Sequence, residues 1–134
     1  MRLRFAAILI VAGLITISCG GITDPSQNTV QTFSGTFSSA SPSGQAFTAA
    51  AGGELTVKLT ALAPVSSSYV GVAWVYQNSD GSCSTNSLFS NQFSQLNVPA
   101  ISGAQISKGA YCIVVYDVVG FTTPETYTMT VSHP

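Results

Sequence analysis

The sequence predicts an all-β protein with one antiparallel β-sandwich of seven to eight short strands. No stretch beyond residue 18 repeats apolar residues at the 3.6-residue spacing of an amphipathic helix. Several short segments instead alternate apolar and polar residues with a period of two. Gly, Pro, Asn and Ser separate these segments at short intervals, which is typical of sandwiches.

Residues 54–60 and 126–131 have the pattern of strands with one buried and one solvent-exposed face. Their predicted inward side chains are Leu55, Val57 and Leu59 in the first segment, and Tyr127, Met129 and Val131 in the second. Polar side chains, mostly threonines, occupy the alternate positions of both segments. We therefore expect each strand to cover one side of the core.

Residues 69–76 and 110–116 are apolar on both faces, which indicates central strands or strands covered on their second side. Trp74 and Tyr76 are accordingly expected to pack in the core. Shorter strands are predicted at residues 32–37, 45–49 and 100–106. Residues 79–99 are rich in Ser, Asn and Gln, and they predict a long loop with at most one short strand.

The N-terminus has the layout of an export signal. Arg2 and Arg4 precede an apolar stretch at residues 5–17, and the small Ser18 leads to Cys19. At about 1.5 Å per residue, these thirteen residues would span roughly 20 Å as a helix, short of the ~30 Å hydrocarbon core of a bilayer. We predict a signal helix at residues 1–18, a flexible tether at 19–28 and the β-sandwich domain at 29–134.

The run Thr16-Ile17-Ser18-Cys19 resembles the bacterial lipobox, although threonine stands where that motif most often has leucine. The resemblance implies that Cys19 is acylated, becomes the new N-terminus and anchors the protein to a membrane of the cell envelope. Because Gly20 follows instead of an aspartate, it also implies the outer membrane in a cell with two membranes. Ordinary cleavage near Ser18 is the alternative, and it too predicts export.

The charge of the predicted mature chain limits its partners. Removing residues 1–18 leaves two lysines against five acids, a formal charge of −3, so nucleic acid is not an expected partner. Seven of the 116 remaining residues are charged, whereas 31 are Ser or Thr. Such a surface suits contact with an envelope protein or polysaccharide, and the solubility of an exported β domain explains the same composition.

Five segments in order along the chain carry a resemblance to a known family: residues 32–37, 45–48, 52–57, 108–116 and 127–131. The fourth reads Lys108-Gly109-Ala110-Tyr111-Cys112-Ile113-Val114-Val115-Tyr116. Together they resemble bacterial pre-peptidase C-terminal domains, which implies a jelly-roll sandwich akin to the collagen-binding modules of bacterial collagenases. Some members of that family bind calcium through clustered acids. Asp24 and Glu54 are the only acids in the first half of this chain, so neither a metal nor another cofactor is expected.

Cys83 and Cys112 remain once Cys19 is acylated, and an even pair in an oxidising compartment predicts a disulfide. The alternative is a buried thiol at Cys112 and a free thiol at Cys83. The bridge would attach the pattern-poor residues 79–99 to the strand that contains Cys112.

No residue pattern predicts catalysis. His133 is the only histidine and stands next to the chain end, where we expect a surface side chain. The predicted function is a non-catalytic binding or structural module, and a secreted accessory domain beside a separate hydrolase is the alternative. Phe89, Phe93 and Phe121 lie in predicted loops and are the candidates for an exposed binding patch.

Overall fold

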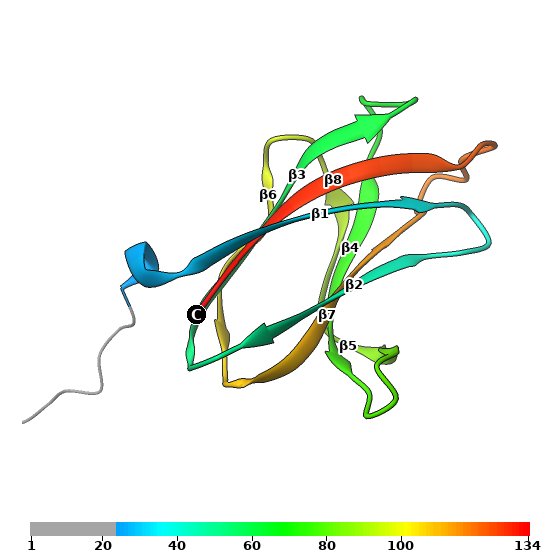
Figure 1. Cartoon of the computed structure of the whole chain (residues 1–134). Helices are drawn as coiled ribbons and strands as arrows, with labels where there is room; N and C mark the ends of the chain where they lie inside the picture. Colours follow the sequence, from blue (N-terminus) through cyan, green and yellow to red (C-terminus); the bar gives the residue numbers. More distant parts are fainter. Residues whose placement is uncertain (1–23) are drawn as a thin grey trace, which may run out of the picture.

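The computed structural model describes residues 24–134, which fold into two four-stranded antiparallel sheets (Figure 1). The first sheet has the strand order β1-β8-β3-β6 and the second β2-β7-β4-β5. This order of eight strands in two sheets is that of a jelly roll, so the predicted sandwich is confirmed. The predicted signal helix and Cys19 lie outside the described residues. The elements are η1 (Pro25–Gln27), β1 (Thr29–Phe37), β2 (Ser43–Ala49), β3 (Gly53–Ala63), β4 (Val70–Gln77), β5 (Cys83–Ser94), β6 (Pro99–Ile106), β7 (Gly109–Tyr116) and β8 (Glu125–His133).

The core lies between the two sheets and follows the predicted alternation. Every second residue is buried in β8, and in β3 as far as Leu59, after which the register shifts. Val57 pairs with Val131, and Leu59 pairs with Met129. The second sheet contributes side chains such as Val72 from β4 to the same cluster. Burying one such aliphatic side chain contributes roughly 1.5–3 kcal/mol, so these paired rows hold the sheets together.

Strands β4 and β7 are apolar on both faces, as expected, and their outer faces carry a second, smaller apolar cluster. Ala73, Val75 and Cys112 are buried there, although they point away from the main core. Cys83, Val114 and Tyr116 pack against them. The beginning of β5 therefore covers part of the outer face of its own sheet.

Strand β5 corrects the prediction of a loop with at most one short strand at residues 79–99. Cys83–Ser94 form a twelve-residue edge strand that pairs with β4, and irregular register interrupts the ladder in three places. Most of its side chains are exposed on both faces. A strand without a buried face has no need for alternating apolar residues, and so the period-two signal is absent.

His133 and Tyr76 also differ from their predictions. The His133 side chain is buried, its ring centroid lies 4.9 Å from that of Phe47, and its Nε2 lies 3.2 Å from Oε1 of Gln31. The chain end is held in place because the amide of Ala50 donates a hydrogen bond to the carbonyl of Pro134. Tyr76 is 54 % exposed at the last position but one of β4, where its ring stacks on that of Tyr111 with centroids 5.4 Å apart.

Of the predicted tether, residues 24–28 are described, and Asn28 bonds to the first sheet. Pro25–Gln27 form the short helix η1, which Asp24 caps through its side chain. The side-chain Nδ2 of Asn28 donates a hydrogen bond to the backbone carbonyl of Glu54 in β3 at 2.9 Å. Within residues 24–134, no helix has the length and apolar character needed to cross a membrane.

Candidate functional site: a groove on the outer face of the second sheet

A groove of about 830 Å³ lies on the outer face of the second sheet. Its floor consists of Ala73 and Val75 from β4 and Val114 and Tyr116 from β7. These residues alternate along their strands with core side chains such as Ile113, so they point outward. Hydroxyl and amide side chains near and along β5 form its polar side: Ser82, Ser84, Thr85, Ser87, Ser90 and Gln92.

Two glycines of the second sheet leave space for large side-chain groups that lie against its outer face. The ring of Tyr116 lies across Gly71, its partner on β4, and a Cβ atom at position 71 would collide with three ring atoms. The sulfur of Cys83 lies over Gly44 in the same way, 2.6 Å from the place that a Cβ atom would take. Both positions therefore require glycine for steric reasons, even though neither has a left-handed backbone.

The Cys83–Cys112 disulfide closes one end of the groove and confirms the predicted pairing. β4 separates β5 from β7, and a spacing of about 4.8 Å between neighbouring strands would place the two cysteines about 9.5 Å apart in a flat sheet. Their Cα atoms are only 5.7 Å apart. The first residues of β5 therefore bend over the outer face of β4, which buries Val75 beneath them.

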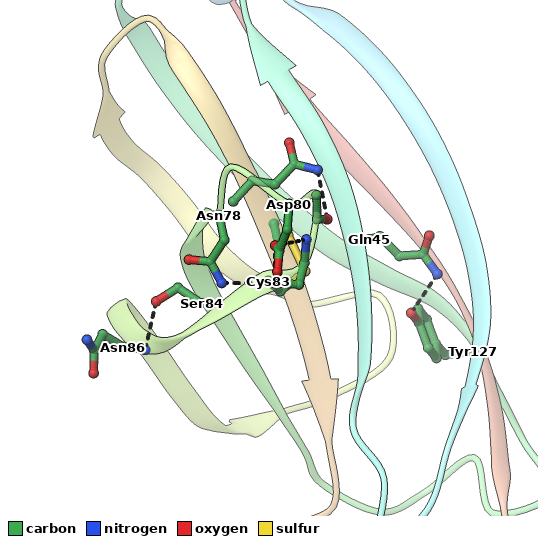
Figure 2. The surroundings of a disulfide bond; sticks show 11 residues. Gln45, Asn78, Asp80, Cys83, Ser84, Asn86 and Tyr127 are labelled. Carbon is green, nitrogen blue, oxygen red and sulfur yellow. Dashed lines mark hydrogen bonds between the residues drawn. A yellow bond between two sulfur atoms is a disulfide. The ribbon is translucent and has the colours of Figure 1, made fainter.

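The turn between β4 and β5 is held by its own polar side chains (Figure 2). Oδ1 of Asp80 accepts hydrogen bonds from the amide and the hydroxyl of Ser82, at 2.9 and 2.6 Å. Asn78 donates to the same hydroxyl, and Gln77 donates to the carbonyl of Gly81. The hydrogen bond from the Ser82 hydroxyl, and to a smaller degree the one from the Ser82 amide, lower the pKa of Asp80. The ionised carboxylate therefore persists to a lower pH than in an ordinary aspartate.

None of the fourteen residues that line the groove is charged. Asp80 is adjacent in sequence to Gly81, so a carboxylate stands beside one end of the groove. The lining offers an apolar floor, one aromatic ring and a side of hydroxyl groups that both donate and accept hydrogen bonds. This arrangement can bind an uncharged ligand that has apolar faces and hydroxyl-rich edges.

The predicted patch of Phe89, Phe93 and Phe121 is not a single surface. Phe89 and Phe93 lie on β5 and are 43 % and 73 % exposed. Phe121 is partly buried and packs edge-to-face on Phe37, with ring centroids 5.8 Å apart. It folds back onto the core because the backbone amide of Phe121 is held by the carboxylate of Asp117 at 2.7 Å.

Phe93 has an exposed aromatic partner in Tyr69. Their rings meet edge-to-face with centroids 5.8 Å apart. Tyr69 immediately precedes β4, and Phe93 is the last residue but one of β5. The pair therefore lies beyond the lining of the groove, at the end of these two strands opposite the disulfide.

Sequence reasoning missed Tyr116 and the hydroxyl side of the groove. The signal for Tyr116 was present, because alternation along residues 110–116 places it on the same face as Cys112 and Val114, opposite the core residues. The serines of β5 carried no such signal, since the strand itself was not predicted.

Other polar and aromatic groups lie away from the groove. Glu125 is fully buried, with Oε2 accepting a hydrogen bond from the amide of Val65 at 3.0 Å and Oε1 without a partner among the described residues. Burial, and to a smaller degree the nearby Tyr76, raises the pKa of Tyr111. In residues 24–134 no three His, Cys, Asp or Glu side chains gather as metal ligands would.

The comparisons with known proteins add no relative. No protein-family model matches the chain, and no curated protein matches it either. The resemblance to pre-peptidase C-terminal domains consequently stays a prediction. The fold and the groove are therefore the observations that bear on the function of this chain.

Proposed function

We propose that the protein is a cell-envelope lipoprotein whose sandwich domain is a non-catalytic binding or structural module, in contact with envelope protein or polysaccharide. The observation that carries the binding role is the groove on the outer face of the second sheet. Binding sites are typically concave, mostly apolar and equipped with a few polar groups, and the groove has these properties. Its volume of about 830 Å³ also falls in the usual range for such sites.

The scaffold supports this role because it holds the groove rigidly. The floor belongs to β4 and β7, the two inner strands of the second sheet, which pair without a register shift from Gly71 to Tyr76 of β4. The disulfide and the hydrogen-bonded turn fix the end that β5 covers. A preformed site loses little conformational entropy when a ligand binds.

Two single-tryptophan variants test the binding role. Ser90 lines the groove and is exposed, so Ser90→Trp places a large ring in the groove without disturbing the core. Thr32 is exposed on β1 of the first sheet, so Thr32→Trp is the matched control. We expect the full acylated chain and Thr32→Trp to bind isolated cell envelopes equally well, and Ser90→Trp to bind far less. Equal binding by all three proteins, or by none, would contradict the proposal.

The lipid anchor has its own test. We expect the intact mass of the mature protein to correspond to a chain that begins at Cys19 and carries two or three acyl chains. We expect Cys19→Ser to be released from membranes, because the acyl chains are the proposed anchor. A Cys19→Ser protein that stays with the membrane fraction would show that another feature anchors the chain.

A further inference from the structure

The charges around the groove restrict its ligand to an uncharged molecule. No lysine or arginine lines the groove, and the two lysines of the described residues lie on β3 and in the turn before β7. A ligand with carboxylates or phosphates would have no cation to pair with, and Asp80 beside the groove would repel it. A cationic ligand would find two carboxylates next to lining residues, Asp80 beside Gly81 and Asp117 beside Tyr116. Both already accept hydrogen bonds within the protein, Asp80 from Ser82 and Asp117 from three backbone amides.

The free polar groups of the groove are suited to hydroxyl groups on the ligand. Ser82 and Ser84 use their hydroxyls within the protein, for Asp80 and for the amide of Asn86. Ser87, Ser90 and Gln92 make no side-chain hydrogen bond to another described residue, so their polar atoms are available. A hydroxyl both donates and accepts, and the same is true of each hydroxyl on a sugar ring.

The shape of the groove favours a chain of linked units over a single small molecule. The lining runs along β5 from Ser84 to Gln92, and the eight steps between these residues, at about 3.3 Å each, extend up to roughly 26 Å. The ring of Tyr116 offers an apolar surface in the groove, and the exposed Tyr69–Phe93 pair offers a second one beyond the lining, where β5 ends. Both can pack against the apolar faces of sugar rings.

A peptide bound as an added strand fits this site less well. Strand addition requires a row of free backbone groups on the edge strand. On β5 the amide of Phe93 is bonded to the side chain of Asn91 at 2.9 Å, and that of Asn86 to Ser84 at 3.1 Å. The three register irregularities also interrupt the regular edge that a pairing strand would need.

We infer that the groove binds a neutral polysaccharide, whose chain runs along β5 from the disulfide to the Tyr69–Phe93 pair. The inference rests on the proposed function, because it names the ligand of the proposed binding groove. It assigns stacking to Tyr116, Tyr69 and Phe93, and hydrogen bonding to Ser87, Ser90 and Gln92.

Affinity electrophoresis of the full acylated chain in mild detergent tests the inference. The gels contain dextran, laminarin or galactomannan as neutral polymers, and polygalacturonate or chitosan as charged ones. We expect at least one neutral polymer to retard the wild type and Thr32→Trp, and Ser90→Trp to lose at least about tenfold in affinity, the factor that corresponds to 1.4 kcal/mol. Retardation is expected to change little between about 0.05 and about 0.5 M NaCl, because no charge is involved.

Three results would overturn the inference: no retardation by any neutral polymer, equal retardation of Ser90→Trp and the wild type, or retardation by the charged polymers alone. Binding of envelope proteins that Ser90→Trp abolishes, without binding of any neutral polymer, would overturn the polysaccharide ligand and leave the proposed binding module intact. If the proposed binding module itself is wrong, the result is different: Ser90→Trp and Thr32→Trp then bind every envelope component equally.

Discussion

The Cα atoms of Cys83 and Cys112 lie 5.7 Å apart even though β4 runs between their two strands. The bridge therefore crosses the outer face of the sheet and holds the first residues of β5 over Val75. It shapes the closed end of the groove as well as stabilising the fold. One covalent bond therefore affects both the stability of the domain and the shape of the proposed binding groove.

Replacing both cysteines with serine is expected to lower the free energy of unfolding by about 2–4 kcal/mol, because the bridge restricts the unfolded chain over a separation of 29 residues. Urea denaturation measures this loss, and the wild type in the presence of a thiol reductant is expected to match the variant. Ligand binding is expected to weaken as well, since the beginning of β5 is no longer held over the sheet. An unchanged denaturation midpoint would show that the bridge contributes nothing to stability.

Gly71→Ala is expected to destabilise the domain by about 1–3 kcal/mol, because the new methyl group collides with the ring of Tyr116. Tyr116→Ala in the same chain removes the collision, so the two changes together are expected to cost less than the sum of their separate costs. Gly52→Ala is the matched control, since its Cβ atom would meet only the carbonyl of Ile106 at an ordinary 3.6 Å. Additive costs at positions 71 and 116 would contradict the contact.

Phe121 and Phe93 are expected to respond differently to truncation. Phe121→Ala removes a ring that packs on Phe37 and is expected to cost about 2 kcal/mol of unfolding free energy. Phe93→Ala removes a ring that is 73 % exposed and is expected to stay within about 0.5 kcal/mol of the wild type. Chemical denaturation measures the unfolding free energy of both variants. A larger loss for Phe93→Ala than for Phe121→Ala would contradict the assignment of Phe121 to the core.

Asp117 is expected to make the stability of the domain depend on acid pH. Partial burial raises its pKa, but hydrogen bonds from the amides of Val119, Gly120 and Phe121 outweigh burial and hold the pKa below the ordinary value. Its stabilisation is therefore complete above the unfolded-state pKa of about 3.9 and is lost as the pH falls through the lower folded-state value. Asp117→Asn is expected to be less stable than the wild type at pH 7, with the difference shrinking toward pH 2. A constant difference over that range would show that the ionised carboxylate is not involved.

The strands that could be predicted are those with one buried face, because such strands alternate apolar and polar residues. Residues 54–60 and 126–131 face the core on one side and solvent on the other, so their alternation identified β3 and β8. β5 has no buried face along most of its length and escaped prediction for that reason.

The candidate site was harder to predict because it depends on how distant segments meet. The disulfide followed from counting cysteines, but its path across β4 depends on the strand order. Tyr76 was expected in the core from its apolar neighbours on β4, but it stands at the last position but one of the strand and is exposed. Local sequence contains neither the strand order nor the limits of the facing sheet.

Amide chemical-shift mapping tests most directly whether the outer groove is the binding surface. The isotope-labelled full chain is titrated with the polymer or envelope fraction that it binds most tightly. We expect the largest shifts at the amides of Ser87, Ser90, Gln92, Val114 and Tyr116, and small shifts on the outer face of the first sheet. Shifts concentrated instead at Ser34 and Thr128, on the outer face of β1 and β8, would contradict the account.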